Sequence, residues 1–267
     1  MHYFFAKIQK ICQKNFTNAN ECDIIYAKEG GEGMRLDKLL SECGVATRSE
    51  SGRAARAGKI TVNGVPVRRA DEKVDPERDR VVYCGEPVVY RRFVYLMLNK
   101  PDGYVSATED AHGDPVVTEL VPAEYRKMGV FPCGRLDKHT LGLMLLTNDG
   151  VLSHRLLAPK SHVTKSYGFR VKFPLSEADR QSLEAGVDIG GYITRPAKVV
   201  LDGEREGVIH ITEGKYHQIK LMMEAVHNQI THLERLTFGS LSLDPSLERG
   251  AWRELTAEEI AALQSNK

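Results

Sequence analysis

One short segment of the 267-residue chain concentrates the residue types with which an enzyme could act. Asp137 occurs in the polar stretch 134–140, which lies between the apolar runs 130–133 and 141–147. A carboxylate on a short loop held at both ends by buried strands has a narrowly fixed position, as a nucleophile or a general base requires. The same spacing also fits an Asp that only closes a turn, and by spacing alone this structural interpretation is about twice as common.

The segments around Asp137 predict an α+β domain with a mixed, mainly antiparallel sheet. Strand candidates outnumber helix candidates and do not alternate with them regularly, which argues against a doubly wound parallel sheet. We expect strands at 93–98, paired as a hairpin with 104–106, and at 129–133, 141–147, 165–172, 197–201 and 208–212. We expect helices at 151–157, preceded by Asp149 as a turn or N-cap residue without a catalytic role, and at 176–185, 215–227 and 257–263.

A smaller module precedes this domain. The apolar spacing within 36–43 predicts a first helix, and Ser49 is a candidate N-cap for a second helix that ends near Gly58. Asn63-Gly64 between two short β-prone runs predicts a hairpin. We therefore place a small domain at 34–92 and a larger domain at 93–267.

Residues 1–33 end in Lys-Glu-Gly-Gly-Glu-Gly and have no helical or strand period. They are either a disordered extension or, because Met34 could itself start the protein, a result of an incorrect choice of gene start.

Composition excludes several classes of protein. Hydrophobic residues make up 42% of the chain, enough for ordinary cores, yet no apolar run approaches the roughly 18 residues of a membrane span. The N-terminus lacks the features of a secretion signal, so we expect a cytoplasmic protein, and a monomer. Nine His and five Cys occur without H-E-x-x-H or C-x-x-C spacing, so we expect no bound metal.

Basic residues cluster in the small module although the whole chain has a formal net charge of only +1. Within 48–69, Glu50 is the single acid. A local excess of Lys and Arg is typical of a surface that binds phosphates, and the plainer alternative is a solvated helix face. The candidate RNA-binding residues are Arg48, Arg53, Arg56, Lys59 and Arg68.

Two sets of motifs resemble known families. Residues 34–50, Met-Arg-Leu-Asp-Lys-Leu-Leu-Ser-Glu-Cys-Gly-Val-Ala-Thr-Arg-Ser-Glu, with Gly-Lys-Ile-Thr-Val-Asn-Gly at 58–64, are similar to an S4 RNA-binding module. Three later motifs resemble those of RNA pseudouridine synthases: Leu-Asn-Lys-Pro-Asp-Gly at 98–103, Gly-Arg-Leu-Asp followed by Thr-Leu-Gly-Leu-Met-Leu-Leu-Thr-Asn-Asp-Gly within 134–150, and Gly-Lys-Tyr-His-Gln-Ile-Lys at 214–220. Their order after an S4 module is most similar to the RsuA/RluB/RluE/RluF group, nearest to its RsuA branch.

The resemblance implies isomerisation of a uridine to pseudouridine in small-subunit 16S rRNA, as free RNA or in an assembling small ribosomal subunit, without a cofactor. Asp137 matches the essential aspartate of the family, which acts either as a nucleophile or by abstracting a ribose proton to give a glycal; we favour the glycal route. A single essential carboxylate differs from the pair that ordinary glycosidases use. Two alternatives remain: the same reaction on 23S rRNA, and a non-catalytic S4-type ribosome-assembly factor.

Three further residues match family positions around the flipped-out base. Tyr167 corresponds to the tyrosine that packs on the base and helps to remove the C5 proton. Lys220 corresponds to the basic residue beside the catalytic carboxylate, where a cation stabilises a charged group in a partly desolvated pocket. Ile219 corresponds to the apolar residue beneath the base, although its helical spacing is equally that of a core residue.

Arg135, Lys100 and His217 are the remaining substrate-binding candidates. Arg135 corresponds to the arginine before the family's Leu-Asp and would fill the gap left by the flipped base or hold a phosphate. Lys100 and His217 are expected to contact the RNA backbone, which positions RNA without reading its sequence. The chain departs from many relatives at His139, where they often have an acidic residue, and at Leu221, where they often have a basic one, so we expect different RNA contacts at these two positions.

Overall fold

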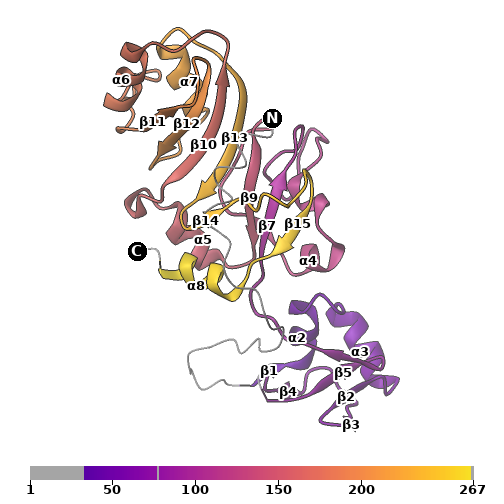
Figure 1. Ribbon diagram of the computed structural model, residues 1–267. Helices are drawn as coiled ribbons and strands as arrows, with labels where there is room; N and C mark the ends of the chain where they lie inside the picture. The colour runs from indigo at the N-terminus through magenta and orange to yellow at the C-terminus, as the bar shows by residue number, and fades with distance from the viewer. Residues whose placement is uncertain (1–32, 77, 266–267) are drawn as a thin grey trace.

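The computed structural model describes residues 33–76 and 78–265, so the expected extension lies outside the described residues except for Gly33. Figure 1 shows two lobes, a small domain that contains β1 to β6 and a large domain that contains β7 to α8. The architecture is α+β, as the sequence predicts. Within the described part of the chain, no helix combines the length and the apolar character needed to cross a bilayer.

The small domain has two helices packed on short strands. A core of ten buried residues, among them Leu36, Leu40 and Ile60, joins the helices to the strands. β2, β3, β5 and β6 form one sheet in the order β3-β2-β5-β6, and β1 pairs with β4. The elements are β1 (Met34–Arg35), α2 (Leu36–Glu42), α3 (Arg48–Arg56), β2 (Ile60–Val62), β3 (Val65–Pro66), β4 (Lys73–Val74), β5 (Val81–Tyr83) and β6 (Glu86–Val88).

Turn and cap residues explain where these elements begin and end. Asn63 and Gly64 have φ values of 53° and 82°, the left-handed pair of a type I′ hairpin, so the predicted hairpin between β2 and β3 is confirmed. The predicted N-cap Ser49 is wrong. Thr47 caps α3, because its hydroxyl accepts from the Glu50 amide while the Glu50 carboxylate accepts from the Thr47 amide, which is a capping box.

The large domain is built on a nine-stranded sheet in the order β11-β12-β10-β13-β9-β7-β15, with β14 beside β13 and β8 beside β9. All pairings are antiparallel except β9 with β13. The strands are β7 (Tyr95–Lys100), β8 (Phe131–Pro132), β9 (Leu141–Thr147), β10 (Lys165–Val171), β11 (Lys198–Leu201), β12 (Glu206–Ile211), β13 (Ile230–Phe238), β14 (Leu241–Ser242) and β15 (Trp252–Glu254). The helices are η2 (Val117–Leu120), α4 (Ala123–Lys127), α5 (Gly150–Leu157), η3 (Pro159–Ser161), α6 (Glu177–Ala185), α7 (Gln218–Ala225) and α8 (Ala257–Ser265).

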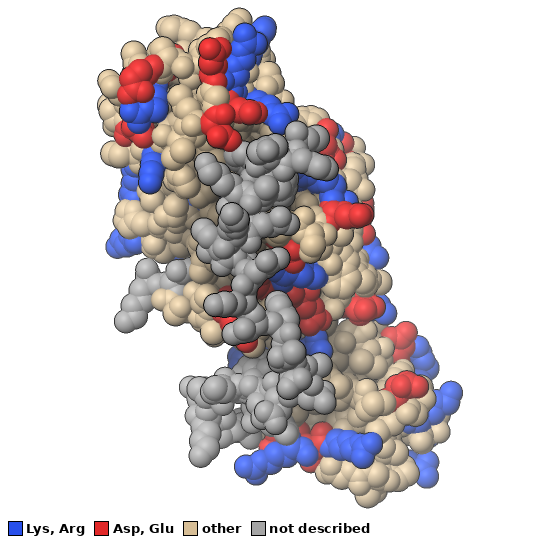
Figure 2. Space-filling model, viewed as in Figure 1, with Lys and Arg blue, Asp and Glu red and all other residues tan. Residues whose placement is uncertain are grey.

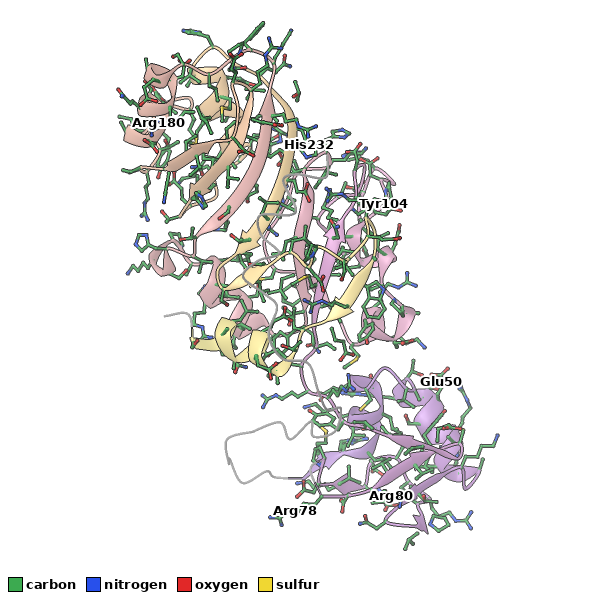
Figure 3. All side chains as sticks on the ribbon, in the orientation of Figure 1. Glu50, Arg78, Arg80, Tyr104, Arg180 and His232 are labelled. Atoms are coloured by element: carbon green, nitrogen blue, oxygen red, sulfur yellow. The ribbon has the colours of Figure 1, made fainter. Side chains whose placement is uncertain are left out.

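Side chains cover both faces of this sheet (Figure 3). Along β7, Leu96 and Leu98 belong to one core, which α6 and α7 also line, whereas Tyr95 and Met97 belong to a second core with α5 and α8. Burial on both faces explains why the central strands are continuous apolar runs instead of alternating ones. The strands that flank Asp137 are thus anchored in the interior.

The sheet differs from the prediction in two ways. Residues 104–106 do not form a hairpin with 93–98: β7 pairs with β9 and β15, and Val105 makes only an isolated parallel bridge to Val116. β13, the longest strand, was not predicted, because the charged residues at its centre break the apolar period that marks a strand.

Gly142 is required where β9 meets β13. Its φ is +94°, and a Cβ at this position would overlap the carbonyl oxygen of Arg235 on β13. A larger residue would therefore have to push apart the parallel pair of strands that follows the Asp137 loop.

Replacing Gly142 by Ala should lower the free energy of unfolding of the large domain by about 2–5 kcal/mol, from backbone strain and overlap together. Gly150→Ala is the matched control, since nothing lies within 4 Å of a Cβ there, and it should change stability by less than about 1 kcal/mol. Urea unfolding followed by the fluorescence of Trp252, the one tryptophan, measures both. Equal stability of the two variants would contradict the overlap.

Candidate active site

Asp137 lies on the connection between β8 and β9, where its backbone is held on both sides. The Thr140 amide donates to the Asp137 carbonyl at 3.0 Å, closing a turn. The Ser106 hydroxyl donates to the Leu136 carbonyl at 2.7 Å and accepts from the Leu136 amide at 3.0 Å. The carboxylate has 27% of its surface exposed, so it is reachable from solvent while its backbone is fixed.

Lys220 and His217 converge on this carboxylate from the start of α7. Lys220 Nζ lies 2.6 Å from Asp137 Oδ2, and His217 Nε2 lies 3.6 Å from Asp137 Oδ1. All three side chains are partly exposed, so the ion pair stands at the edge of the interior. Attraction between close opposite charges is stronger at such an edge than in bulk water, so the pair holds the carboxylate in one orientation.

The first turn of α7 explains how Lys220 and His217 reach Asp137. The prediction of a helix from Lys215 was wrong, because His217 adopts a left-handed conformation with φ of 50° and α7 starts at Gln218. The buried Gln218 side chain accepts from the Lys215 amide at 2.9 Å and donates to Glu213 at 2.7 Å. These bonds fix the segment that precedes Lys220.

Ile219 and Tyr167 are both buried in the larger apolar core of this domain. Ile219 is 4% exposed and Tyr167, in the middle of β10, is 7% exposed. Both belong to the same apolar cluster as Leu136, and Leu136 and Ile219 immediately precede Asp137 and Lys220 in the chain. Ile219 is thus a core residue placed next to the site, so that its two interpretations are compatible.

The burial of Lys100 contradicts the prediction that it contacts the RNA backbone. Its side chain is fully buried, and its ammonium donates to the carbonyls of Pro101, Lys138 and Thr140 at 3.1, 2.9 and 2.9 Å. Burial lowers the pKa of Lys100 to about 8, although the nearby Asp102 and Asp137 carboxylates oppose the shift. The folded protein therefore leaves no surface of Lys100 for a phosphate, and the residue instead ties the turn after Asp137 to the end of β7.

Arg135 is exposed beside cations that are already paired. Lys138 Nζ lies 2.7 Å from Asp114 Oδ1. His139 Nδ1 lies 2.8 Å from Asp102 Oδ1, and this hydrogen bond lowers the pKa of the Asp102 carboxyl. Arg135 has no ion pair with any residue that the structure describes, which leaves its guanidinium available to a phosphate or a base.

The five candidate RNA-binding residues of the small domain are all exposed, and none has a carboxylate within 4.0 Å among the described residues. Arg69, next to this group, is instead paired with Asp71 at 2.7 Å. In the view of Figure 2, Lys and Arg side chains line the outer edge of the small domain. The surface on and after α3 is accordingly an unneutralised positive patch, formed by Arg48, Arg53, Arg56, Lys59 and Arg68.

Two residues that support the site were not predicted from the sequence. Ser106 braces Leu136 from 30 positions away, a contact that no local spacing indicates. Arg235 on β13 is 1% exposed and donates to the Leu143 carbonyl at 2.7 Å, which ties β13 to β9. The role of Arg235 could not be found without knowing that β13 pairs with β9.

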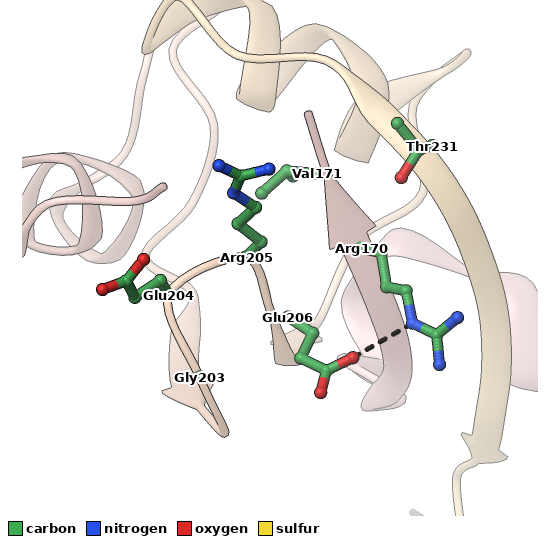
Figure 4. Close-up of a pocket in the computed structure, with 7 residues that line it drawn as sticks. All are labelled: Arg170, Val171, Gly203, Glu204, Arg205, Glu206 and Thr231. Carbon is green, nitrogen blue, oxygen red and sulfur yellow. Dashed lines mark hydrogen bonds and ion pairs between the residues drawn. The ribbon is translucent and has the colours of Figure 1, made fainter. Parts of the chain in front are cut away.

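A hollow at the turn of the β11–β12 hairpin, next to the end of β10, is separate from this site (Figure 4). It is lined by the turn 203–206 together with Arg170, Val171 and Thr231. Arg170 is paired there with Glu206 at 3.0 Å. Among the described residues, no group of three or more His, Cys, Asp or Glu side chains is arranged to hold a metal ion.

Replacing Lys100 by Met should remove a pH-dependent contribution to stability. Because its pKa is lower in the folded than in the unfolded chain, burying this charge costs about 3 kcal/mol below pH 8, and the cost disappears as the pH rises to about 10.5. The free energy of unfolding of the wild type relative to Lys100→Met should therefore rise over this window. Urea unfolding followed by circular dichroism measures it, and a difference independent of pH would contradict the assignment.

Comparison with known families gives two matches. The family described as RNA pseudouridylate synthase matches residues 94–225, and the S4 domain matches residues 34–81. An uncharacterized RNA pseudouridine synthase of Bacillus subtilis, YtzG, is 50% identical over 235 residues, which cover 86% of this chain and 98% of that protein. The ribosomal small subunit pseudouridine synthase A of Escherichia coli is 37% identical over 86% of this chain and all of that protein. A crystal structure of a pseudouridylate synthase matches with a TM-score of 0.60 and 34% identity, over 86% of this chain and 99% of that one.

Proposed function

Because the chain belongs to the family of RNA pseudouridine synthases that carry an S4 domain, we propose that it converts a uridine of 16S rRNA to pseudouridine with Asp137 as the catalytic residue. The observation that carries the proposal is the contact of 2.6 Å between Asp137 Oδ2 and Lys220 Nζ, on a loop braced by buried strands. The choice of 16S rRNA is supported by relatives at 36–38% identity that are named as small-subunit enzymes.

The reaction needs little more than such a site. The N1–C1′ bond of the uridine breaks, the uracil turns, C5 bonds to C1′, and the proton of C5 is lost while N1 regains one, so that product and substrate are isomers. In the route we favour, Asp137 takes a proton from the ribose to give a glycal and returns it later. A carboxylate held in one orientation by Lys220 and His217 can carry out both transfers without large movement.

The uracil must leave its stack to reach Asp137. We propose that it lies against Tyr167 and Ile219, which belong to the same apolar cluster as Leu136, the residue before Asp137. Arg135 would occupy the gap in the RNA or hold a phosphate, since it is exposed and unneutralised among the described residues. His217, close to both Asp137 and solvent, completes the polar side of the pocket.

Asp137→Asn tests catalysis separately from binding. The amide cannot accept the proton, so pseudouridine formation in 16S transcript or assembling subunits should fall by more than about 1,000-fold, while the dissociation constant for RNA should stay within about threefold. Mass-spectrometric mapping of purified 16S and 23S transcripts measures conversion. Modification confined to 23S rRNA would replace the substrate that we propose, and activity without Asp137, or none in the wild type, would favour a non-catalytic RNA-binding factor.

Arg53→Ala with Arg56→Ala tests the positive patch of the small domain. The slope of log affinity against log salt is negative, and each lost phosphate contact should reduce its magnitude by about 0.7–0.9. The double variant should therefore reduce it by about 1.5. The matched control is Arg170→Ala, because Glu206 already neutralises this arginine in the large domain. Filter binding between low and moderate salt measures the slopes, and an unchanged slope in the double variant would show that RNA does not use this patch.

A further inference from the structure

An exposed aromatic ring stands beside the site and has no role in the mechanism above. Tyr216 is 73% exposed. Its ring stacks on His217 with the ring centroids 3.8 Å apart and the planes 18° from parallel. His217 Nε2 in turn lies 3.6 Å from Asp137 Oδ1, so a single imidazole separates the tyrosine from the carboxylate.

The segment that carries Tyr216 is held by side-chain hydrogen bonds. Gln218 binds the Lys215 amide and Glu213, as described above. Glu213 also accepts from the Tyr192 hydroxyl at 2.8 Å and from the Arg195 amide at 3.0 Å. These contacts tie the segment 213–218 to the loop 188–195, so the exposed ring has a defined position on a supported backbone.

The surroundings of Tyr216 favour a negatively charged partner. Lys215 is exposed, with Nζ 4.1 Å from the centroid of the Tyr192 ring. The guanidinium of Arg195 contacts the ring of His162. His162 is close in the chain to the exposed Lys160, and residues 150–165 contain no Asp or Glu. Aromatic faces interleaved with cations are the surface that unpaired RNA strands bind, by base stacking and phosphate contacts.

We propose that Tyr216 is a stacking platform for a base of the substrate RNA that neighbours the target uridine. The inference rests on the proposed function and specifies which part of the RNA is bound outside the pocket. When the uridine is extruded, its neighbour loses a stacking partner, and the free face of the tyrosine supplies one next to Asp137. Because every base has a π face, the contact contributes affinity and leaves the sequence of the RNA unread.

The alternative is that Tyr216 only supports the imidazole of His217. The two roles differ in what they change. A stacking platform holds RNA in the complex, so its loss raises KM and the dissociation constant. A support for His217 acts on the reacting groups, so its loss lowers kcat with RNA affinity unchanged.

Tyr216→Ala, Tyr216→Phe and Tyr216→Trp separate these roles on the transcript that the wild type modifies. The Ala variant should lose about 10-fold in kcat/KM with kcat within about twofold, and the Phe and Trp variants should stay near the wild type, since a ring is retained. In the Asp137→Asn background, where no turnover is expected, Tyr216→Ala should weaken equilibrium binding of 16S transcript by a similar factor.

Phe173→Ala is the matched control, because Phe173 is 52% exposed and lies beside Lys172, at the opposite end of β10 from the site. Phe173→Ala should change neither kcat/KM nor the equilibrium binding of the transcript. The proposal is overturned if Tyr216→Ala leaves binding unchanged, if it lowers kcat alone, or if Phe173→Ala weakens binding equally. A wild type that modifies neither transcript would refute the proposed function, and the binding measurements would still decide the role of Tyr216.

Discussion

The ion pair between Lys220 and Asp137 joins two parts of the chain that are distant in sequence, the β8–β9 loop and the first turn of α7. It exists only because both backbones are already fixed: one by buried strands and the Ser106 hydroxyl, the other by Gln218 and Glu213. Two flexible side chains on mobile backbones would gain little from such a contact in water. Here both backbones are fixed by contacts other than the ion pair, so the attraction between the charges serves to orient the carboxylate.

Lys100 shows how much of the interior serves this loop. Burying an ammonium is costly, and the lowered pKa of Lys100 reflects that cost. Three carbonyl oxygens, those of Lys138 and Thr140 at the turn after Asp137 and that of Pro101 after β7, offset part of it. Because these carbonyls lie on two separate segments, the lysine acts as an internal clamp between the end of β7 and the turn. The protein is less stable because this charge is buried, and in return the position of the Asp137 carboxylate is fixed more narrowly.

Charge is divided between the two domains in a way that suits RNA. The formal net charge of +1 conceals an unneutralised patch on and after α3, while Arg69, Arg170 and Arg180 are paired with acids. Around the site, exposed cations lie next to aromatic rings. Among the described residues, the small domain thus carries exposed, unpaired cations, and the large domain carries the Asp137 carboxylate beside Lys220 and an exposed aromatic ring.

The sequence by itself determined the α+β class and most helices and strands, because these follow from local periodicity, and motifs that are contiguous in the chain supplied Asp137 and Lys220 as predicted site residues. Only the tertiary structure decided that Lys100 is buried, that Ser106 and Arg235 support the loop, and that Tyr216 stacks on His217 in the open. The physical reason is that burial, ion pairing and exposure depend on which strands become neighbours. The place of β13 between β9 and β10 is set by packing across the whole sheet and leaves no local signal.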